Sequence, residues 1–348
     1  MRTDLARRLP DNPLLRPVAL RPSSPDLRVE CLLNPGAFRF EGSVWLLVRV
    51  AERPGQVPGR VRFPCMEGGR VRVIDVADDD PDFDGSDPRE FKYQGNGYLS
   101  TLSHLRLLRS EDGVRFEDTG RRLTGEGDQE GYGIEDCRVA SLADGRFLLT
   151  YTAVGACGYG VGLRVTRDWR TFEHHGLILP PANKDCAIFD ERVGGDYLAL
   201  HRPSCVIVGG HDIWLARSPD LLHWGGHVCI ARTRPGRWDE QRIGAGAAPL
   251  RTERGWLVVY HGADRNKRYC LGALLLDLDD PSRVISRSGE PIMEPLSDYE
   301  RHGFFGEVVF TNGHVVDGDE LTVYYGASDS VVCAARLSIR EILARLPN

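Results

Sequence analysis

One heptapeptide combines residue types that can perform acid–base chemistry. In residues 133–139, Gly-Ile-Glu-Asp-Cys-Arg-Val, Glu135 and Asp136 are adjacent carboxylates, and Arg138 follows two positions after Asp136. Neighbouring residues of a strand point to opposite faces, so regular strand geometry predicts that Asp136 and Arg138 share a face and that Glu135 does not. An arginine on the same face would keep a carboxylate ionised or fix its orientation. The alternative is a surface ion pair at the start of a strand.

Basic residues recur further along the chain, beside small residues and near the ends of expected strands. Lys184 lies in Asn-Lys-Asp-Cys-Ala-Ile-Phe and Arg202 in His-Arg-Pro. Arg242 opens the stretch Arg-Ile-Gly-Ala-Gly-Ala, and His261 lies in Tyr-His-Gly. Small residues let a ligand approach the backbone closely. Each basic side chain alone is better explained as a solvated strand end, but four in two consecutive repeats predict one oxyanion site, bound by arginine forks and a lysine point charge.

Short β-type segments must position these residues. They are rich in β-branched and aromatic residues and are separated by Gly, Pro and Asp, which is typical of strands and turns. The expected strands are residues 44–50, 98–108, 147–154, 161–166, 197–201, 213–217, 256–261, 271–278, 321–325 and 331–337. Asn34-Pro35-Gly36 has the composition of a turn, and only residues 338–346 have helical spacing. The chain is therefore predicted to be all-β with a short C-terminal helix.

A repeated motif indicates how the strands are grouped. A hydroxyl residue, an aspartate two positions later and an aromatic four after that occur at 110–116, 166–172 and 218–224, with a weaker copy at 280–284. The hydroxyl and carboxylate can bond turn amides while the aromatic packs under the hairpin. The three copies begin 56 and 52 residues apart, and a four-stranded propeller blade needs about 40–50 residues. This favours a five-bladed β-propeller over a sandwich, with its site in the central channel.

Composition narrows the class of protein. The chain has 348 residues, 41% of them hydrophobic, and a net charge of −6, so it has material for a sizeable core and no global positive field for nucleic acid or a membrane. Its nine cysteines are scattered without CxxC or Cys/His metal spacing. No apolar run approaches eighteen residues. These features predict a cytoplasmic protein with reduced thiols and no metal site.

The ordered motifs together resemble glycoside hydrolase family 130, the β-mannoside phosphorylases and related β-mannosidases. The motifs are NPG followed by Arg49, then GIEDCRV, NKDCAIF, HRP, RIGAG, YHG and YYGASD, and the resemblance runs from about residue 30 to 338. It implies a five-bladed β-propeller. We expect residues 1–28 to form an N-terminal extension that packs on a catalytic propeller of residues 29–348.

The resemblance also implies residue roles. Asp136 matches the single catalytic acid, which in the family's phosphorylases is thought to protonate the glycosidic oxygen indirectly, through the 3-hydroxyl of the mannose in subsite −1. The positions that hold this mannose are matched by Asn34, Arg49 and Asp329. The phosphate cluster is matched by Lys184, Arg202, Arg242 and His261, with Lys184 and Arg242 as conservative departures. Arg138 and Asp185, inside the same motifs, are expected to contact the substrate.

The basic cluster favours phosphorolysis over hydrolysis. Inverting hydrolysis ordinarily needs two carboxylates, one as acid and one as base, whereas phosphorolysis needs only the acid because phosphate is the nucleophile. The hydrolytic branch of the family is similar except for Glu at phosphate positions, where this chain has Arg202 and Arg242. We therefore predict inverting, reversible phosphorolysis of a β-mannoside to α-mannose 1-phosphate, with inorganic phosphate as co-substrate and no metal or organic cofactor.

Two other functions are consistent with these patterns: a β-mannosidase that uses water, and a non-catalytic propeller that binds sugar or protein. The substrate could be a manno-oligosaccharide, a mannosyl-glucose or a mannosyl-N-acetylglucosamine. The linkage, β-1,2 or β-1,4, and the acceptor depend on residues 51–97 and 117–132. The oligomeric state stays open, although members of the family often associate, which allows a homo-oligomer.

Overall fold

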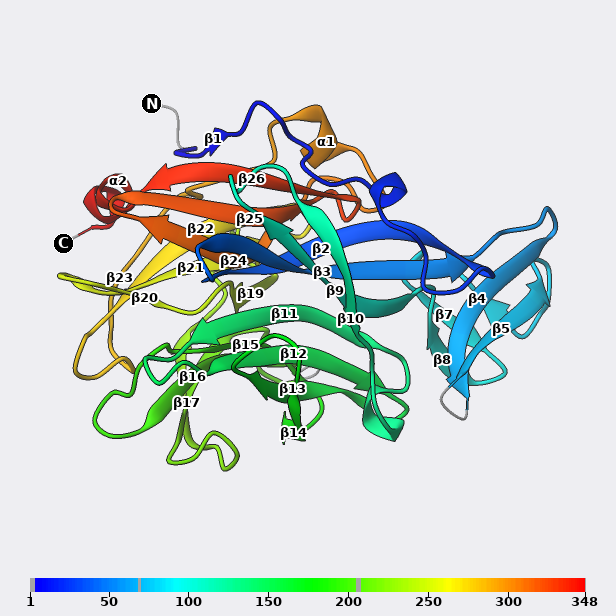
Figure 1. Cartoon of the computed structure of the whole chain (residues 1–348), viewed down its shortest axis with the longest axis horizontal. Helices are drawn as coiled ribbons and strands as arrows, with labels where there is room; N and C mark the ends of the chain where they lie inside the picture. The colour runs from blue at the N-terminus through cyan, green and yellow to red at the C-terminus, as the bar shows by residue number, and fades with distance from the viewer. Residues whose placement is uncertain (1–3, 68–69, 205–207, 348) are drawn as a thin grey trace.

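The computed structural model describes residues 4–67, 70–204 and 208–347, and nearly all of its regular structure is β-strand (Figure 1). Five antiparallel sheets form most of it, and we number them in chain order. Sheet 1 pairs β2 (Leu27–Phe40), β3 (Ser43–Pro54), β9 (Leu102–Ser110) and β10 (Glu117–Leu123). Sheet 2 pairs β11 (Ile134–Ser141), β12 (Phe147–Gly155), β13 (Gly158–Thr166) and β14 (Glu173–Leu179). Sheet 3 pairs β15 (Asn183–Ile188), β16 (Tyr197–Pro203), β17 (Ile213–Ser218) and β18 (Gly225–Ala231).

The last two sheets each include one very short strand. Sheet 4 pairs β19 (Arg242–Ala245), β21 (Gly255–Ala263), β22 (Tyr269–Leu276) and β23 (Val284–Arg287), with β20 (Leu250–Thr252) beside β21. Sheet 5 pairs β24 (Val309–Asp317), β25 (Glu320–Ala327) and β26 (Val331–Ser338), and its fourth strand is β1 (Arg7–Arg8). The N-terminal strand therefore completes the sheet that the C-terminal strands begin.

Helices are few and short. The described helices are α1 (Asp298–Arg301), α2 (Ile339–Arg345) and two 3₁₀ turns, η1 (Pro17–Ala19) and η2 (Asp128–Glu130). The hydroxyl of Ser338 caps α2 by accepting a hydrogen bond from Glu341 N at 3.1 Å. The prediction of an all-β chain with a short C-terminal helix is confirmed, although α1 was not predicted and the expected strand 98–108 is split between β8 (Asn96–Leu99) and β9. No described helix is long and apolar enough to cross a membrane.

Apolar side chains fill the space between successive sheets. Five buried clusters lie between sheets 1 and 2, 2 and 3, 3 and 4, 4 and 5, and 5 and 1. The first strands follow the same cycle, because β24 contacts β2, β2 contacts β11, β11 contacts β15 and β15 contacts β19, while β22 of sheet 4 contacts β24. Side chains alternate across a strand, so each sheet has an apolar residue set for each neighbour. The first strands of the sheets thus surround one central region.

The repeated motif has the structure that its residue types predict. In the first copy, Ser110 Oγ accepts from Gly113 N at 2.9 Å, and Asp112 Oδ1 accepts from the next two amides at 2.8 Å. The copies at 166–172 and 218–224 repeat these bonds. Each copy joins the third strand of its sheet to the fourth. The motif is therefore the outer hairpin of sheets 1, 2 and 3.

Bulges interrupt the first strands where they face the central region. Register shifts occur at residues 33–36 in β2, 135–138 in β11, 184–187 in β15 and 311–313 in β24. The Asn34-Pro35-Gly36 segment is therefore a bulge inside a strand, and its interpretation as a turn is wrong. A bulge leaves an extra residue unpaired and re-aims its side chain.

Residues 60–99 form an insertion between β3 and β9. It contains β4 (Arg60–Glu67) paired with β5 (Arg70–Ala77), and β6 (Phe83–Asp84), β7 (Glu90–Tyr93) and β8 in a second small sheet. Phe63 packs on aromatic rings from the second small sheet, including Tyr98 at 5.2 Å between centroids. The insertion projects beside the five sheets, at the right of Figure 1, and has an apolar core of its own.

Candidate active site

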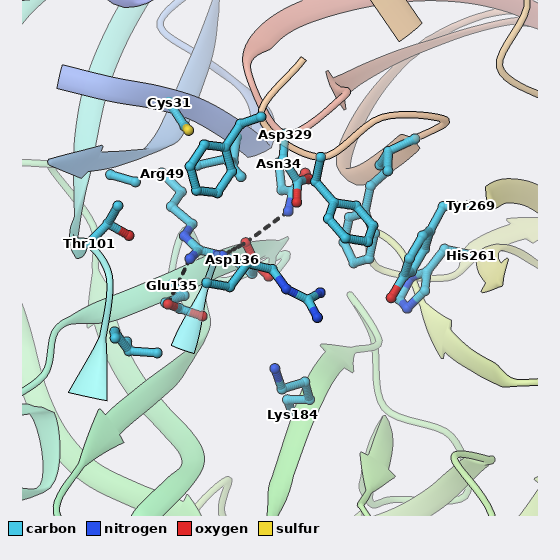
Figure 2. Close-up of a pocket in the computed structure, with 18 of the residues that line it drawn as sticks. Cys31, Asn34, Arg49, Thr101, Glu135, Asp136, Lys184, His261, Tyr269 and Asp329 are labelled. Carbon is cyan, nitrogen blue, oxygen red and sulfur yellow. Dashed lines mark hydrogen bonds and ion pairs between the residues drawn. The ribbon is translucent and has the colours of Figure 1, made fainter. Parts of the chain in front are cut away.

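A cavity of about 320 Å³ opens at the central region, with walls from all five sheets and from the insertion. Nine of the ten predicted site residues line it: Asn34, Arg49, Asp136, Lys184, Asp185, Arg202, Arg242, His261 and Asp329. Figure 2 shows Asp136 beside Asn34 and Arg49, with Lys184 on a separate strand and His261 on the opposite side. Residues as far apart in sequence as Asn34 and Asp329 thus meet in one pocket.

The β11 bulge places both carboxylates of the heptapeptide in this pocket. Asp136 has a φ of +50°, and Glu135 and Asp136 both line the cavity. Arg49 bridges them, because its Nη1 donates to Asp136 Oδ1 at 3.2 Å and its Nη2 to Glu135 Oε1 at 2.7 Å. Asn34 Nδ2 donates to the same Asp136 oxygen at 3.0 Å. The strand-geometry prediction that Glu135 faces away is wrong, since the bulge breaks the alternation on which it depended.

Arg138 is the predicted site residue that does not line the cavity. It is only 2% exposed, and its Nη2 donates to Asp185 Oδ1 at 3.0 Å. Its other bonds go to the backbone carbonyls of Asp136, Ala245 and Gly246. These contacts join sheets 2, 3 and 4 behind the pocket, so Arg138 supports the pocket wall instead of meeting the substrate. Its predicted pairing with the Asp136 carboxylate is replaced by Arg49.

The carboxyl groups of Asp136 and Asp329, which both line the pocket, have opposite pKa shifts. Burial alone would raise the pKa of Asp136, but the charges of Arg49, Arg138 and Lys184 and the Asn34 hydrogen bond hold it below its usual value. Burial raises the pKa of Asp329 to about 6, against the lowering effect of Arg49 and with a further rise from the charge of Asp136. Opposed shifts of this kind mark acid–base sites.

The other end of the pocket carries positive charge. Lys184 and Arg242 have no ion pair with any described carboxylate, and Lys184 Nζ lies 4.7 Å from the centroid of the Tyr159 ring. Arg202 Nε donates to Asp185 Oδ2 at 2.6 Å, which leaves its two Nη groups without a described partner. Cations held partly out of water without counter-ions favour an anionic ligand.

Aromatic and insertion residues complete the walls and were not found from the sequence. Tyr269 and Phe310 line the pocket and flank the His261 ring, with the Phe310 centroid 4.1 Å away. Arg89 of the insertion lies 4.7 Å from the Phe305 ring centroid, and its guanidinium is fixed by Asp87. No motif marks these residues, because their contribution depends on how distant segments pack.

The pocket therefore combines carboxylates with a cluster of cationic side chains. Among the described residues no group of three His, Cys, Asp or Glu side chains could hold a metal ion. The family model described as beta-1,4-mannooligosaccharide phosphorylase matches residues 90–347. The chain belongs to glycoside hydrolase family 130, as its motifs predicted.

Characterised relatives are similar over most of the chain. A beta-1,2-mannobiose phosphorylase of Listeria innocua is 39% identical over 97% of this chain and 98% of its own length. A 1,2-beta-oligomannan phosphorylase of Thermoanaerobacter is 38% identical over 70% of this chain and 82% of its own. The solved structure of the Listeria enzyme with beta-1,2-mannobiose superposes with a TM-score of 0.95 and covers 98% of this chain and 99% of that one.

Proposed function

We propose that the protein is an inverting β-mannoside phosphorylase that uses inorganic phosphate to form α-mannose 1-phosphate. The observation that carries this proposal is that Lys184 and Arg242, two cations without an ion pair among the described residues, line the same pocket as the Asp136 carboxylate. Together with the free Nη groups of Arg202 they offer charge-assisted donors to an oxyanion. Phosphate held there acts as the nucleophile, so no second carboxylate is needed to activate water.

Asp136 is the proposed proton donor. Its lowered pKa makes it ionised in the free enzyme at neutral pH, so it must gain a proton before it acts. Lys184 is one of the charges that lower this pKa. A phosphate dianion beside Lys184 offsets that charge, and binding of the nucleophile therefore raises the pKa of the acid and favours its protonated form.

The proposed mannose site lies between Asp136 and sheet 5. Asn34 lines the pocket, and its Oδ1 is buried without a hydrogen-bond partner among the described residues. Asp329 lines the pocket and has no hydrogen bond or ion pair with the side chains that the structure describes. Buried polar groups normally have partners, so these atoms are suited to sugar hydroxyls. Arg49 fixes Asp136 from the other side and orients it toward the sugar.

The proposed substrate is a β-1,2-linked mannoside such as β-1,2-mannobiose. The Listeria and Thermoanaerobacter relatives named above act on this linkage, and the first of them aligns with nearly the whole chain. No metal or organic cofactor is proposed, because the acid and the cationic cluster supply the proton and hold the nucleophile. The enzyme belongs to the glycosyl-transferring phosphorylases.

The proposed architecture is a five-bladed β-propeller. It is supported by the cycle of five apolar cores and by the first strands around one pocket. In this arrangement β1 makes residues 4–20 an extension that packs on the fifth blade. A cytoplasmic location agrees with the eight described cysteines, all of them free thiols; Cys205 lies outside the described residues.

The test is phosphate-dependent cleavage. β-1,2-Mannobiose and β-1,4-mannobiose are incubated with the enzyme in the presence and absence of phosphate, and mannose and α-mannose 1-phosphate are quantified. We expect equimolar mannose and α-mannose 1-phosphate from the β-1,2 substrate with phosphate, and no cleavage without it. Release of two mannoses per substrate without phosphate would instead establish the hydrolase.

A further inference from the structure

The oxyanion end of the pocket contains a buried hydrogen-bond acceptor as well as cations. Asp185 lies in the β15 bulge with a φ of +56° and is 2% exposed. Its Oδ1 accepts from Arg138, and its Oδ2 accepts from Arg202 and lies 3.3 Å from His261 Nε2. A carboxylate oxygen can accept two hydrogens, so Oδ1 keeps one free lone pair in a group that lines the cavity.

His261 adds a second acceptor beside it. The ring is 1% exposed, and neither of its nitrogens makes a hydrogen bond of good geometry with a described residue, although Nε2 lies within ion-pair distance of Asp185. Burial, with the charges of Arg202 and Arg138, holds the pKa of His261 below its usual value against the opposing effect of Asp185. Neutral imidazole has one N–H and one acceptor nitrogen. The hydrogen belongs on Nε2, which faces the ionised Asp185, so Nδ1 is an acceptor without a donor.

The close approach of these two groups is built into the sheet. A Cβ on Gly244 would lie 2.3 Å from Asp185 Oδ2 and 2.6 Å from His261 Nε2. Glycine at this position of β19 therefore lets the carboxylate and the imidazole meet beneath the pocket. Arg202, Arg138 and His261 together hold the pKa of Asp185 well below its usual value, although its burial opposes this.

We propose that the Asp185–His261 pair recognises a hydrogen on the bound oxyanion. Lys184, Arg242 and the Nη groups of Arg202 attract any small oxyanion, but only a ligand that carries a hydrogen can donate to the acceptor pair. Hydrogen phosphate does so through its P–OH group. Sulfate has the same charge and shape without that hydrogen, so it would bring an oxygen against an acceptor lone pair. This inference rests on the proposed function and defines which ionic form of the nucleophile the site selects.

The experiment compares four tetrahedral dianions by calorimetry on the whole chain near pH 8. Phosphate and arsenate carry one hydrogen at this pH, whereas sulfate and selenate carry none. We expect the first two to bind about tenfold to a hundredfold more tightly, the usual range for a hydrogen bond to a charged group. Equal affinity of phosphate and sulfate, within about twofold, would overturn the proposal.

Two variants separate recognition from positioning. Asp185→Asn keeps the side-chain volume but removes the charge and supplies a donor, so the phosphate-to-sulfate ratio should fall at least about tenfold. Arg242→Gln is the matched control, because it removes a cation and should weaken all four anions by a common factor. If Asp185→Asn also weakened all four equally, Asp185 would only position Arg202 and the proposal would be wrong.

A second measurement covers the case in which Asp185→Asn fails to fold. Inhibition of wild-type phosphorolysis by sulfate should then show an inhibition constant at least about tenfold above the KM for phosphate. If β-1,2-mannobiose is cleaved only with phosphate yet all four anions bind equally, the inference fails and the proposed function stands. If neither phosphate nor arsenate is bound or consumed, both fail.

Discussion

Arg202 and Arg242 both line the cationic end of the pocket, but they differ in their other contacts. Arg202 donates to the buried Asp185 at 2.6 Å, whereas Arg242 has no ion pair with a described carboxylate. Replacement of either arginine by glutamine should therefore damage phosphate use. Only Arg202→Gln should also damage the fold, because it takes a partner from a buried carboxylate.

The magnitudes follow from these contacts. Hydrogen bonds to charged groups contribute about 1.5–3 kcal/mol, so each variant should raise the KM for phosphate, or lower kcat/KM for phosphate, about tenfold to a hundredfold or more. Breaking a buried ion pair from one side costs about 3–5 kcal/mol. Asp185 keeps its ion pair with Arg138 after Arg202 is replaced, so we expect Arg202→Gln to lower the free energy of unfolding by an amount near the lower end of this range. Arg242→Gln should change the free energy of unfolding by about 0.5 kcal/mol or less.

The assay is a pair of titrations on each variant, one in phosphate at saturating β-1,2-mannobiose and one in the reverse arrangement, with thermal and denaturant unfolding alongside. Arg72→Gln is a matched control, since Arg72 is 62% exposed and its one ion pair with a described residue is with Glu67 at 2.8 Å. Exposed pairs contribute at most about 1 kcal/mol. An unchanged phosphate dependence in Arg242→Gln, or equal destabilisation by both pocket variants, would refute the reasoning.

Three further predictions concern single residues in or next to the pocket. Asp136→Asn should lower kcat about 10²–10⁴-fold, because it removes the proton donor but not its volume, and it should also lower the melting temperature, because Arg49 loses one of its two carboxylate partners; retention of a third of the activity would exclude Asp136 as the acid. Asp329 has a raised pKa, about 6 in the folded state against 3.8, so its stabilising contribution is complete below pH 3.8 and is lost as pH rises through 6. Asp329→Asn should therefore gain stability relative to wild type as pH rises from 4 to 7, measured by denaturant unfolding, and a pH-independent difference would contradict the shift. Gly244→Ala should cost about 1–3 kcal/mol of stability by overpacking against Asp185 and raise the KM for phosphate more than that for the mannoside; equal rises would argue against a local effect at the oxyanion site.

Strand positions and the outer hairpins were predictable because both depend on short-range sequence. Alternation, β-branched residues and turn formers act within a few positions. The hydroxyl–aspartate motif likewise closes its own turn, as Ser110 and Asp112 do with the amides that follow them. Its recurrence therefore located the last hairpin of three sheets before their pairing was known.

The sequence motifs predicted most of the polar residues that line the pocket, but they did not predict how these side chains are arranged. Glu135 and Asp136 both line it because the β11 register shifts between residues 135 and 138. A shift of one residue moves a side chain to the other face of a strand, and no glycine marks the positive φ of Asp136. Arg89 and Phe305 lie outside every motif, and their contact joins the insertion to the loop before β24.

The pairing of β1 with β26 has a consequence for the order in which the protein can be made. Arg7 lies opposite Arg336 in sheet 5, so this sheet stays incomplete on the ribosome until residue 336 and its neighbours have left the exit tunnel. The pocket needs Asn34 and Arg49 from the first sheet as well as Asp329 from the last. A nascent chain therefore has neither a completed sheet 5 nor a full set of pocket residues until residues 329–336 have been made. Until then we expect sheets 1 to 4 to be stabilised by their own strand pairing and by the apolar clusters between them, and binding of substrate cannot assist their folding.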